Sequence, residues 1–169
     1  RPAMAERGVL IADAGPLIGR SRIGSLNLLR DLFGQVLMTP EVRDEALPAA
    51  DFPDKAVIAA ALDAGWLSVQ PFPADDWQPI NPGLGTGERS VIAAALRLPG
   101  CLLLIDDRAG RLEARAQGLR TVGTAAVIGM AKLAGQIPAA RPILERLQPS
   151  GYFIGPAVIA AVLRDVGEG

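Results

Sequence analysis

Short runs of aliphatic residues alternate along the chain with longer segments in which apolar positions recur every three or four residues. The short runs predict β-strands, and the longer segments predict amphipathic α-helices. We expect strands at residues 9–12, 36–38, 66–69, 101–105 and 120–122. We expect helices that begin near Gly15-Pro16, Gly24, Thr39-Pro40 and Thr124, and further helices over residues 55–64, 88–98, 108–117, 139–147 and 156–166.

The alternation of strands and helices predicts an α/β fold with a mostly parallel, doubly wound sheet. Residues 101–105 are apolar without interruption, so we expect both faces of that strand to be covered. Four prolines between residues 71 and 82 predict a long surface loop. The sequence at residues 57–62 recurs at 91–96, but no third copy follows, and we therefore reject a repeat architecture.

Length and composition favour one domain over residues 1–169. Half of the 169 residues are hydrophobic, which is enough for a core without disulfides or zinc. The longest aliphatic runs are too short to cross a bilayer, so we expect no membrane association. We expect Met4 to be the native start, with residues 1–3 an addition ahead of it, and residues 149–169 to form a C-terminal helical segment.

Several absences exclude common kinds of enzyme site. The chain has no histidine, which excludes serine and cysteine hydrolase triads and histidine-ligated metals. Its single cysteine, Cys101, lies in an apolar run, where we expect a small buried side chain and a reducing, cytoplasmic environment. Neither lysine, Lys55 or Lys132, follows the glycine of a phosphate-binding loop, and residues 83–90 fit neither nucleotide-binding glycine pattern.

Acidic residues follow the predicted strands. Asp13 ends the first strand, Asp106 and Asp107 end the strand at residues 101–105, and Glu88 begins the helix before that strand. Glu45 lies on the helix after the second strand. Because ligands bind beyond the carboxyl ends of parallel strands, we expect these carboxylates to converge at one edge of the sheet.

Carboxylates that share a site repel one another, so we expect a cation among them. The candidate ligands all carry oxygen, which selects Mg²⁺ or Mn²⁺ before Zn²⁺. Metal-assisted hydrolysis of a phosphodiester bond is the chemistry that such a site favours. The net charge of −1 gives no overall attraction to nucleic acid, although fifteen of the seventeen cations are arginines and a local patch would not show in the total.

The same residues also have structural interpretations. Asp13 could cap the helix that follows it, Glu45 could be a solvated surface residue, and Glu88 could complement a helix dipole. Arg108 and Arg111 could hold a substrate phosphate or pair with the acids. Thr124 is expected to cap a helix, although its hydroxyl could also bind phosphate or water.

Five segments in a fixed order carry a family resemblance, namely IADAGPLI (11–18), LLRDLFGQVLMTPEVRDEAL (28–47), GTGERSVIAAAL (85–96), LLLIDDRAGRLEA (102–114) and TVGTAAVIGMAKLAG (121–135). Their order and spacing resemble the PIN-domain nucleases, in particular the single-domain prokaryotic group related to VapC toxins of type II toxin–antitoxin systems. The resemblance implies a three-layer α/β/α sandwich and a metal-dependent endoribonuclease. It also implies RNA as the substrate, a small antitoxin protein as a partner, and a homodimer.

Matched by position, Asp13 resembles the first acid of the family, Glu45 the second, Glu88 the third, and Asp106 or Asp107 the fourth. The resemblance implies that Asp13, Glu88 and Asp106 are the leading candidates for metal ligands. Glu45 and Asp107 would then complete the cluster or orient water.

The chain departs from the family pattern at two places. Many relatives carry a serine or threonine shortly after the first aspartate, where this chain has Ala14 and Gly15. The usual Thr-x-Asp of VapC proteins is replaced by Ile105-Asp106-Asp107, so the fourth acid is not assigned to one residue.

Two other functions are compatible with clustered acids. A catalytically silent PIN-like module would bind RNA or a protein partner without hydrolysis and would be indifferent to Mn²⁺. A receiver-like signalling domain also gathers acids at strand ends, but its aspartate pair usually follows the first strand, whereas here the pair follows a late one.

Overall fold

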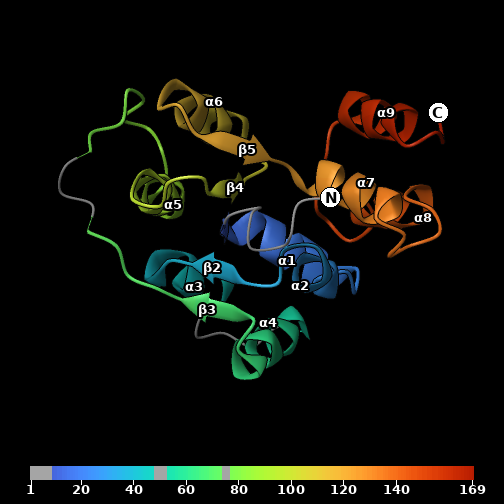
Figure 1. Ribbon diagram of the computed structural model, residues 1–169, viewed down its shortest axis with the longest axis horizontal. Helices are drawn as coiled ribbons and strands as arrows, with labels where there is room; N and C mark the ends of the chain where they lie inside the picture. The colour runs from blue at the N-terminus through green and yellow to red at the C-terminus, as the bar shows by residue number, and fades with distance from the viewer. Residues whose placement is uncertain (1–8, 48–52, 74–76) are drawn as a thin grey trace.

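A computed structural model of the chain describes residues 9–47, 53–73 and 77–169. Its centre is a five-stranded sheet in which all neighbouring strands are parallel and the order is β3-β2-β1-β4-β5 (Figure 1). The strands are β1 (Leu10–Ala12), β2 (Val36–Met38), β3 (Leu67–Val69), β4 (Leu102–Leu104) and β5 (Arg120–Val122). The prediction of a mostly parallel sheet is confirmed.

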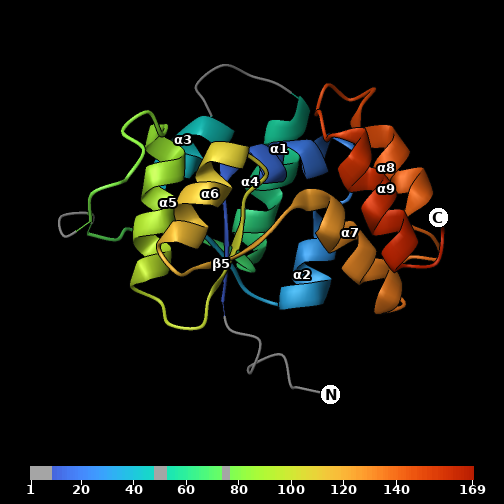
Figure 2. The same ribbon diagram turned by 90° about the horizontal axis from the view of Figure 1, so that it is seen from above.

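Helices cover both faces of the sheet. Within the described residues these are α1 (Ala14–Arg22), α2 (Asn27–Phe33), α3 (Pro40–Ala46), α4 (Pro53–Ala64), α5 (Thr86–Leu96), α6 (Arg108–Ala116), α7 (Thr124–Leu133), α8 (Arg141–Leu147) and α9 (Pro156–Asp165). Helices α5 and α6 lie on one face and α1, α2 and α7 on the other (Figure 2). The arrangement is the three-layer α/β/α sandwich that the resemblance implied.

Several element ends differ from the sequence prediction. Helix α5 begins at Thr86 and ends at Leu96, two residues earlier at each end than expected. At its C-terminal end, Pro99 disfavours the helical conformation of Leu98, which directly precedes it. Helix α8 likewise begins at Arg141 rather than residue 139, with Pro142 in its first turn. The predicted cap of α3 is confirmed, since Thr39 Oγ1 accepts the Val42 amide at 3.2 Å.

The hydrophobic core consists of two clusters. The larger one surrounds the sheet, and Leu103 and Leu104 of β4 are fully buried in it, which confirms that this strand is covered on both faces. The predicted burial of Cys101 is confirmed as well. The smaller cluster joins the C-terminal helices α8 and α9 to α7 and to the end of α1, through Ile23, Ala125, Ile128, Ala140, Leu144, Leu147, Val162, Leu163 and Val166.

The proline-rich loop between β3 and α5 is more closely attached than expected. In its described residues, Phe72 and Trp77 pack against the larger cluster. The buried carboxylate of Glu113 accepts the amides of Ile80 and Asn81 at 3.1 and 2.7 Å. No helix in the described part of the chain is long and apolar enough to span a bilayer. The expected start at Met4 lies outside the described residues.

Candidate functional site

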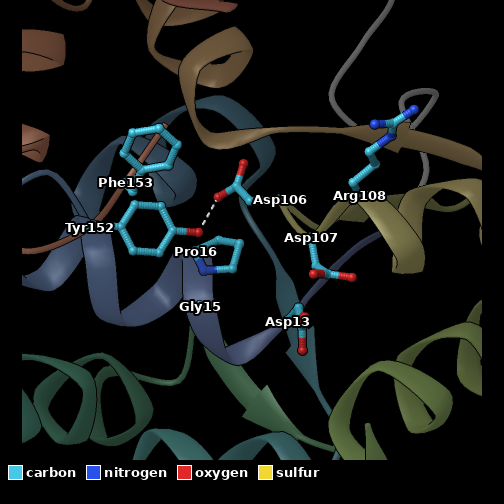
Figure 3. Close-up of a pocket in the computed structure, with 8 residues that line it drawn as sticks. All are labelled: Asp13, Gly15, Pro16, Asp106, Asp107, Arg108, Tyr152 and Phe153. Atoms are coloured by element: carbon cyan, nitrogen blue, oxygen red, sulfur yellow. Dashed lines mark hydrogen bonds between the residues drawn. The ribbon is translucent and has the colours of Figure 1, made fainter. Parts of the chain in front are cut away.

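The candidate site lies where β1 and β4 end side by side. The Asp13 amide donates to the Leu104 carbonyl at 3.0 Å, which ties the ends of the two strands together. Helices leave adjacent strands in opposite directions at this point of the sheet, which opens a crevice at the carboxyl edge. A pocket of about 370 Å³ occupies it, lined by Asp13, Gly15, Pro16, Asp106, Asp107, Arg108, Tyr152 and Phe153 (Figure 3).

Asp13 is a nearly buried carboxylate at the start of α1. It is 7% exposed, and its Oδ1 accepts the Ala14 amide at 2.9 Å as the N-cap of the helix. The pKa of Asp13 is raised from 3.8 to about 6, chiefly by burial and also by the charges of Glu45, Asp107 and Asp106, while the Ala14 hydrogen bond opposes the shift. Asp13 therefore caps a helix and also lies among the other acids.

Glu88 and Asp107 form a hydrogen-bonded pair. Burial and the bond to Asp107 raise the pKa of Glu88 to about 7. The Gly110 amide, which donates to Asp107 Oδ2 at 2.8 Å, lowers the pKa of Asp107, and Arg111 lowers it further. The shared proton therefore belongs to Glu88, while Asp107 stays ionised as the N-cap of α6.

Glu45 reaches the site from α3 through contact with α5. Its Oε1 accepts the Gly87 amide at 3.1 Å, and a Cβ atom on Gly87 would overlap that oxygen. The two helices are also joined by a hydrogen bond of 2.7 Å between the hydroxyls of Thr39 and Ser90. The absence of a side chain at Gly87 thus permits the approach of Glu45.

Asp106 is held by the start of α7. Its Oδ1 accepts the Thr124 amide at 2.7 Å, and its Oδ2 accepts the Thr124 hydroxyl at 2.6 Å and the Tyr152 hydroxyl. The prediction that Thr124 caps α7 is wrong, because the N-cap is Gly123 and the Asp106 side chain accepts the first helical amide instead. Thr124 is fully buried and its hydroxyl donates to Asp106, and a contact of Thr124 with phosphate stays a prediction.

The two candidate arginines differ in position. Arg108 is exposed and lines the pocket, on the opposite side of the acids from Tyr152 and Phe153 (Figure 3). Arg111 lies one helical turn further along α6, where its charge acts on Asp107. Arg108 therefore lines the pocket, whereas Arg111 is the arginine whose charge acts on Asp107.

Tyr152 is the residue of the site that the sequence did not reveal. It comes from the loop between α8 and α9, and its ring lies over Gly15 and Gly19 of α1. A Cβ on Gly19 would lie 2.7 Å from the ring, so only glycine leaves room for it. The only available signal was the pair Gly15 and Gly19, spaced one helical turn apart in a helix that otherwise has no need of glycine.

A buried arginine lies beneath the acids. Arg20 is fully buried and donates to the carbonyl oxygens of Thr124 at 3.1 Å and Ser25 at 3.4 Å, while its Nε has no hydrogen-bond partner. Burial lowers its pKa to about 10, and Asp106 opposes this shift, so Arg20 remains a cation at neutral pH. Its charge offsets part of the negative charge of Asp106.

The donor set of the site suits a hard divalent cation, since all the candidate ligands are carboxylate oxygens and the neighbouring acids help to raise the pKa values of Asp13 and Glu88. In the described ranges, however, no three acidic or cysteine side chains stand close enough to form a complete metal site. Both carboxylate oxygens of Asp106 already accept hydrogen bonds from Thr124 or Tyr152, and Glu88 is bonded to Asp107. Cation binding therefore requires Glu88 to lose its proton and the carboxylates to turn inward.

Comparison with known proteins supports the architecture described above. The chain is similar to a PilT N-terminus domain protein from the hyperthermophilic archaeon Sulfolobus solfataricus P2, with a TM-score of 0.51 and 18% identity over 70% of this chain and 89% of that one. This likeness shows the fold. No curated protein matches the chain significantly.

A family model gives the more specific result. The model of the DUF3368 family, described as a PIN domain, matches residues 9–168 and so spans the sheet, all five acids and the Tyr152 loop. PIN domains are generally nucleases and typically use divalent metals. The chain belongs to the DUF3368 family of PIN domains.

Proposed function

We propose that this protein is a metal-dependent endoribonuclease that hydrolyses RNA phosphodiester bonds. The observation that carries the proposal is the state of Asp13, a nearly buried carboxylate among Glu45, Asp106 and Asp107 whose pKa is raised to about 6. A fold does not keep such repulsion for stability alone, and perturbed acids in a crevice are typical of catalytic sites. PIN-domain membership supports hydrolysis of nucleic acid as the reaction.

Asp13, Glu88 and Asp107 are the residues we assign to binding Mg²⁺ or Mn²⁺. When bound, such a cation binds phosphate oxygens and lowers the pKa of a coordinated water. Asp106 has its oxygens occupied by Thr124 and Tyr152, so we assign it to positioning rather than to direct ligation. This assignment differs from the sequence expectation, in which Asp106 preceded Asp107.

Glu45 and Arg108 complete the proposed reaction. The Gly87 amide fixes Glu45 Oε1, so Oε2 is the atom that accepts a proton from the attacking water. Arg108 is exposed at the rim of the pocket and binds a phosphate oxygen of the substrate.

The test is cleavage of a labelled single-stranded RNA with Mn²⁺, with Mg²⁺ and with a chelator. We expect Asp13→Asn to lower the rate by at least about a hundredfold, since it removes a metal ligand. Asp44→Asn is the matched control, because Asp44 lies on α3 beside Glu45 and its carboxylate is exposed to solvent. Undiminished cleavage by Asp13→Asn would contradict the assignment, and RNA binding without hydrolysis in any metal would favour the silent binding module.

We also propose a small antitoxin as the partner that controls the enzyme. A pocket lined by three aspartates suits a basic side chain of a bound peptide, which would compete with the cation. Expression of the chain with the product of an adjacent small gene should abolish cleavage and give a stable complex. Full activity of the complex would contradict this role.

A further inference from the structure

Phe153 is an exposed aromatic residue beside the acids. It is 72% exposed and lines the same pocket as Asp13 and Asp107. An isolated exposed hydrophobic residue needs no explanation by itself. Its position in the lining of a charged pocket is what requires one, because an exposed neutral ring stands there beside carboxylates.

The neighbours of Phe153 hold it outward. Tyr152 is anchored by its bond to Asp106 and by its packing over Gly15 and Gly19, and Ile154 packs against the smaller hydrophobic cluster. The two inward-facing side chains leave Phe153 between them pointing away from the core. Figure 3 shows the Phe153 ring above that of Tyr152, with Asp106 to the right of both rings and Arg108 further to the right.

The charges of the pocket divide the contacts that a nucleotide could make. The acids of the pocket repel a phosphate unless a bound cation or the charge of Arg108 offsets them, whereas they do not repel an uncharged base. Any base has a flat π-face that stacks on an aromatic ring without regard to sequence. Phe153 therefore suits the base, and Arg108 suits the phosphate.

We propose that Phe153 is a stacking platform for an unpaired base of single-stranded RNA next to the phosphate held at the acids. The inference rests on the proposed function and makes it more specific. A base in a duplex is stacked between its own neighbours and cannot lie on Phe153. The site therefore selects single-stranded RNA over duplex RNA.

The test is equilibrium binding of a short fluorescent RNA in an Asp13→Asn background, which prevents cleavage. Phe153→Ala and Phe153→Leu should each weaken binding of the single strand by between about fivefold and a hundredfold, the range expected for one stacked base. Phe153→Trp should retain it. Leu133→Ala is the matched control, because Leu133 is 69% exposed but lies outside the pocket, and it should bind like the parent.

An oligonucleotide of abasic sugar phosphates should bind all these variants equally, since it has no base to stack. Full affinity in Phe153→Ala, or in Phe153→Leu, would overturn the inference. Separate cleavage assays use the chain that keeps Asp13, with and without the Phe153 substitutions. They distinguish the nuclease proposal from the stacking proposal. RNA that is bound through Phe153 but never cleaved contradicts the nuclease alone, whereas cleavage and binding that ignore Phe153 contradict the platform alone.

Discussion

Asp13 has two roles whose energetic demands conflict. As the N-cap of α1 it accepts the Ala14 amide, and this bond stabilises the helix. As a buried anion facing other anions it destabilises the folded chain, which is why its pKa rises to about 6. Asparagine could keep the first role and abolish the second, because its side-chain oxygen can accept the same amide and carries no charge.

We therefore predict that Asp13→Asn is more stable than the natural chain at pH 8 without metal. A carboxyl whose pKa is higher in the folded state binds its proton more tightly there, so stability falls as pH rises from about 4 to about 6. A shift from 3.8 to about 6 corresponds to at most about 3 kcal/mol. Urea unfolding at pH 8 should show a higher free energy of unfolding for Asp13→Asn, and this gain should disappear near pH 4. A lower free energy of unfolding at pH 8 would contradict burial as the cause of the raised pKa.

Most of the acidic residues could be predicted from the sequence because each follows a strand or begins a helix. The position after a strand fixes which edge of the sheet a residue occupies. It does not fix which oxygen atoms are already bonded, so the different roles of Asp106 and Asp107 needed the structure. Tyr152 was not predicted because its contact with Asp106 spans 46 positions and leaves no local pattern.

At the scale of elements, close approach between helices depends on residues without side chains. Helices α3 and α5 meet where Gly87 donates to Glu45. Helix α1 accepts the ring of Tyr152 over Gly15 and Gly19. In both cases the missing side chain of a glycine leaves room for a contact that positions an acid, Glu45 at Gly87 and Asp106, through Tyr152, at Gly19. Substitution of either glycine by alanine tests this role.

Gly87→Ala should lower RNA cleavage with little change in stability. The added Cβ overlaps Glu45 Oε1, but that oxygen is the end of a flexible side chain and can turn away. Alanine also favours a helix by about 1 kcal/mol relative to glycine, which offsets the lost contact. The rate should match that of Glu45→Gln, and the double variant should be no slower than either. Additive losses would show that Gly87 acts by another route.

Gly19→Ala should lower both stability and cleavage. Its Cβ would meet three ring atoms of Tyr152 at 2.7–2.9 Å, and the ring cannot move without leaving Asp106. Overpacking of this kind costs about 1–3 kcal/mol. Gly155→Ala, with no atom within 4 Å of the new Cβ, is the control, and thermal melting with a cleavage assay measures both effects. An unchanged melting temperature for Gly19→Ala would contradict the packing.

The helices themselves were largely predictable, but their ends depended on tertiary contacts. Helix α7 illustrates the limit, because Thr124 has a capping side chain and stands where a cap was expected. The Asp106 carboxylate, 18 positions earlier, takes the cap role and draws the Thr124 hydroxyl to itself. The helix-capping propensity of a residue depends on its neighbours in sequence. It cannot account for a carboxylate that the end of another strand brings to the first amide of the helix.

At the scale of the whole molecule, the question is whether the two hydrophobic clusters unfold together. Ile137 and Ile143 pack against both clusters, which links the C-terminal helices to the body around the sheet. One domain over the chain remains a prediction, and it requires that damage to the smaller cluster destabilise the larger one.

Leu163→Ala tests this prediction from α9. Leu163 is 5% exposed in the smaller cluster, and its truncation should cost about 2–5 kcal/mol through the cavity that it leaves. Val158→Ala on the same helix is the control, since Val158 is 40% exposed and its loss should stay within about 0.5 kcal/mol. Calorimetry should show one transition shifted to lower temperature, and two separate transitions would contradict the single domain.

Because a chain is synthesised from its N-terminus, the Tyr152 contact forms later than the acids of the site are made. The five acids have all been translated by residue 107, whereas the hydroxyl that holds Asp106 and the neighbouring aromatic ring come from residues 152 and 153. A nascent chain that ends before residue 152 therefore carries the five acids of the site but lacks the Tyr152 contact with Asp106. If the proposed ribonuclease depends on Asp106 being held in place, its activity is expected to begin only after residues 152 and 153 have been made and have packed against α1.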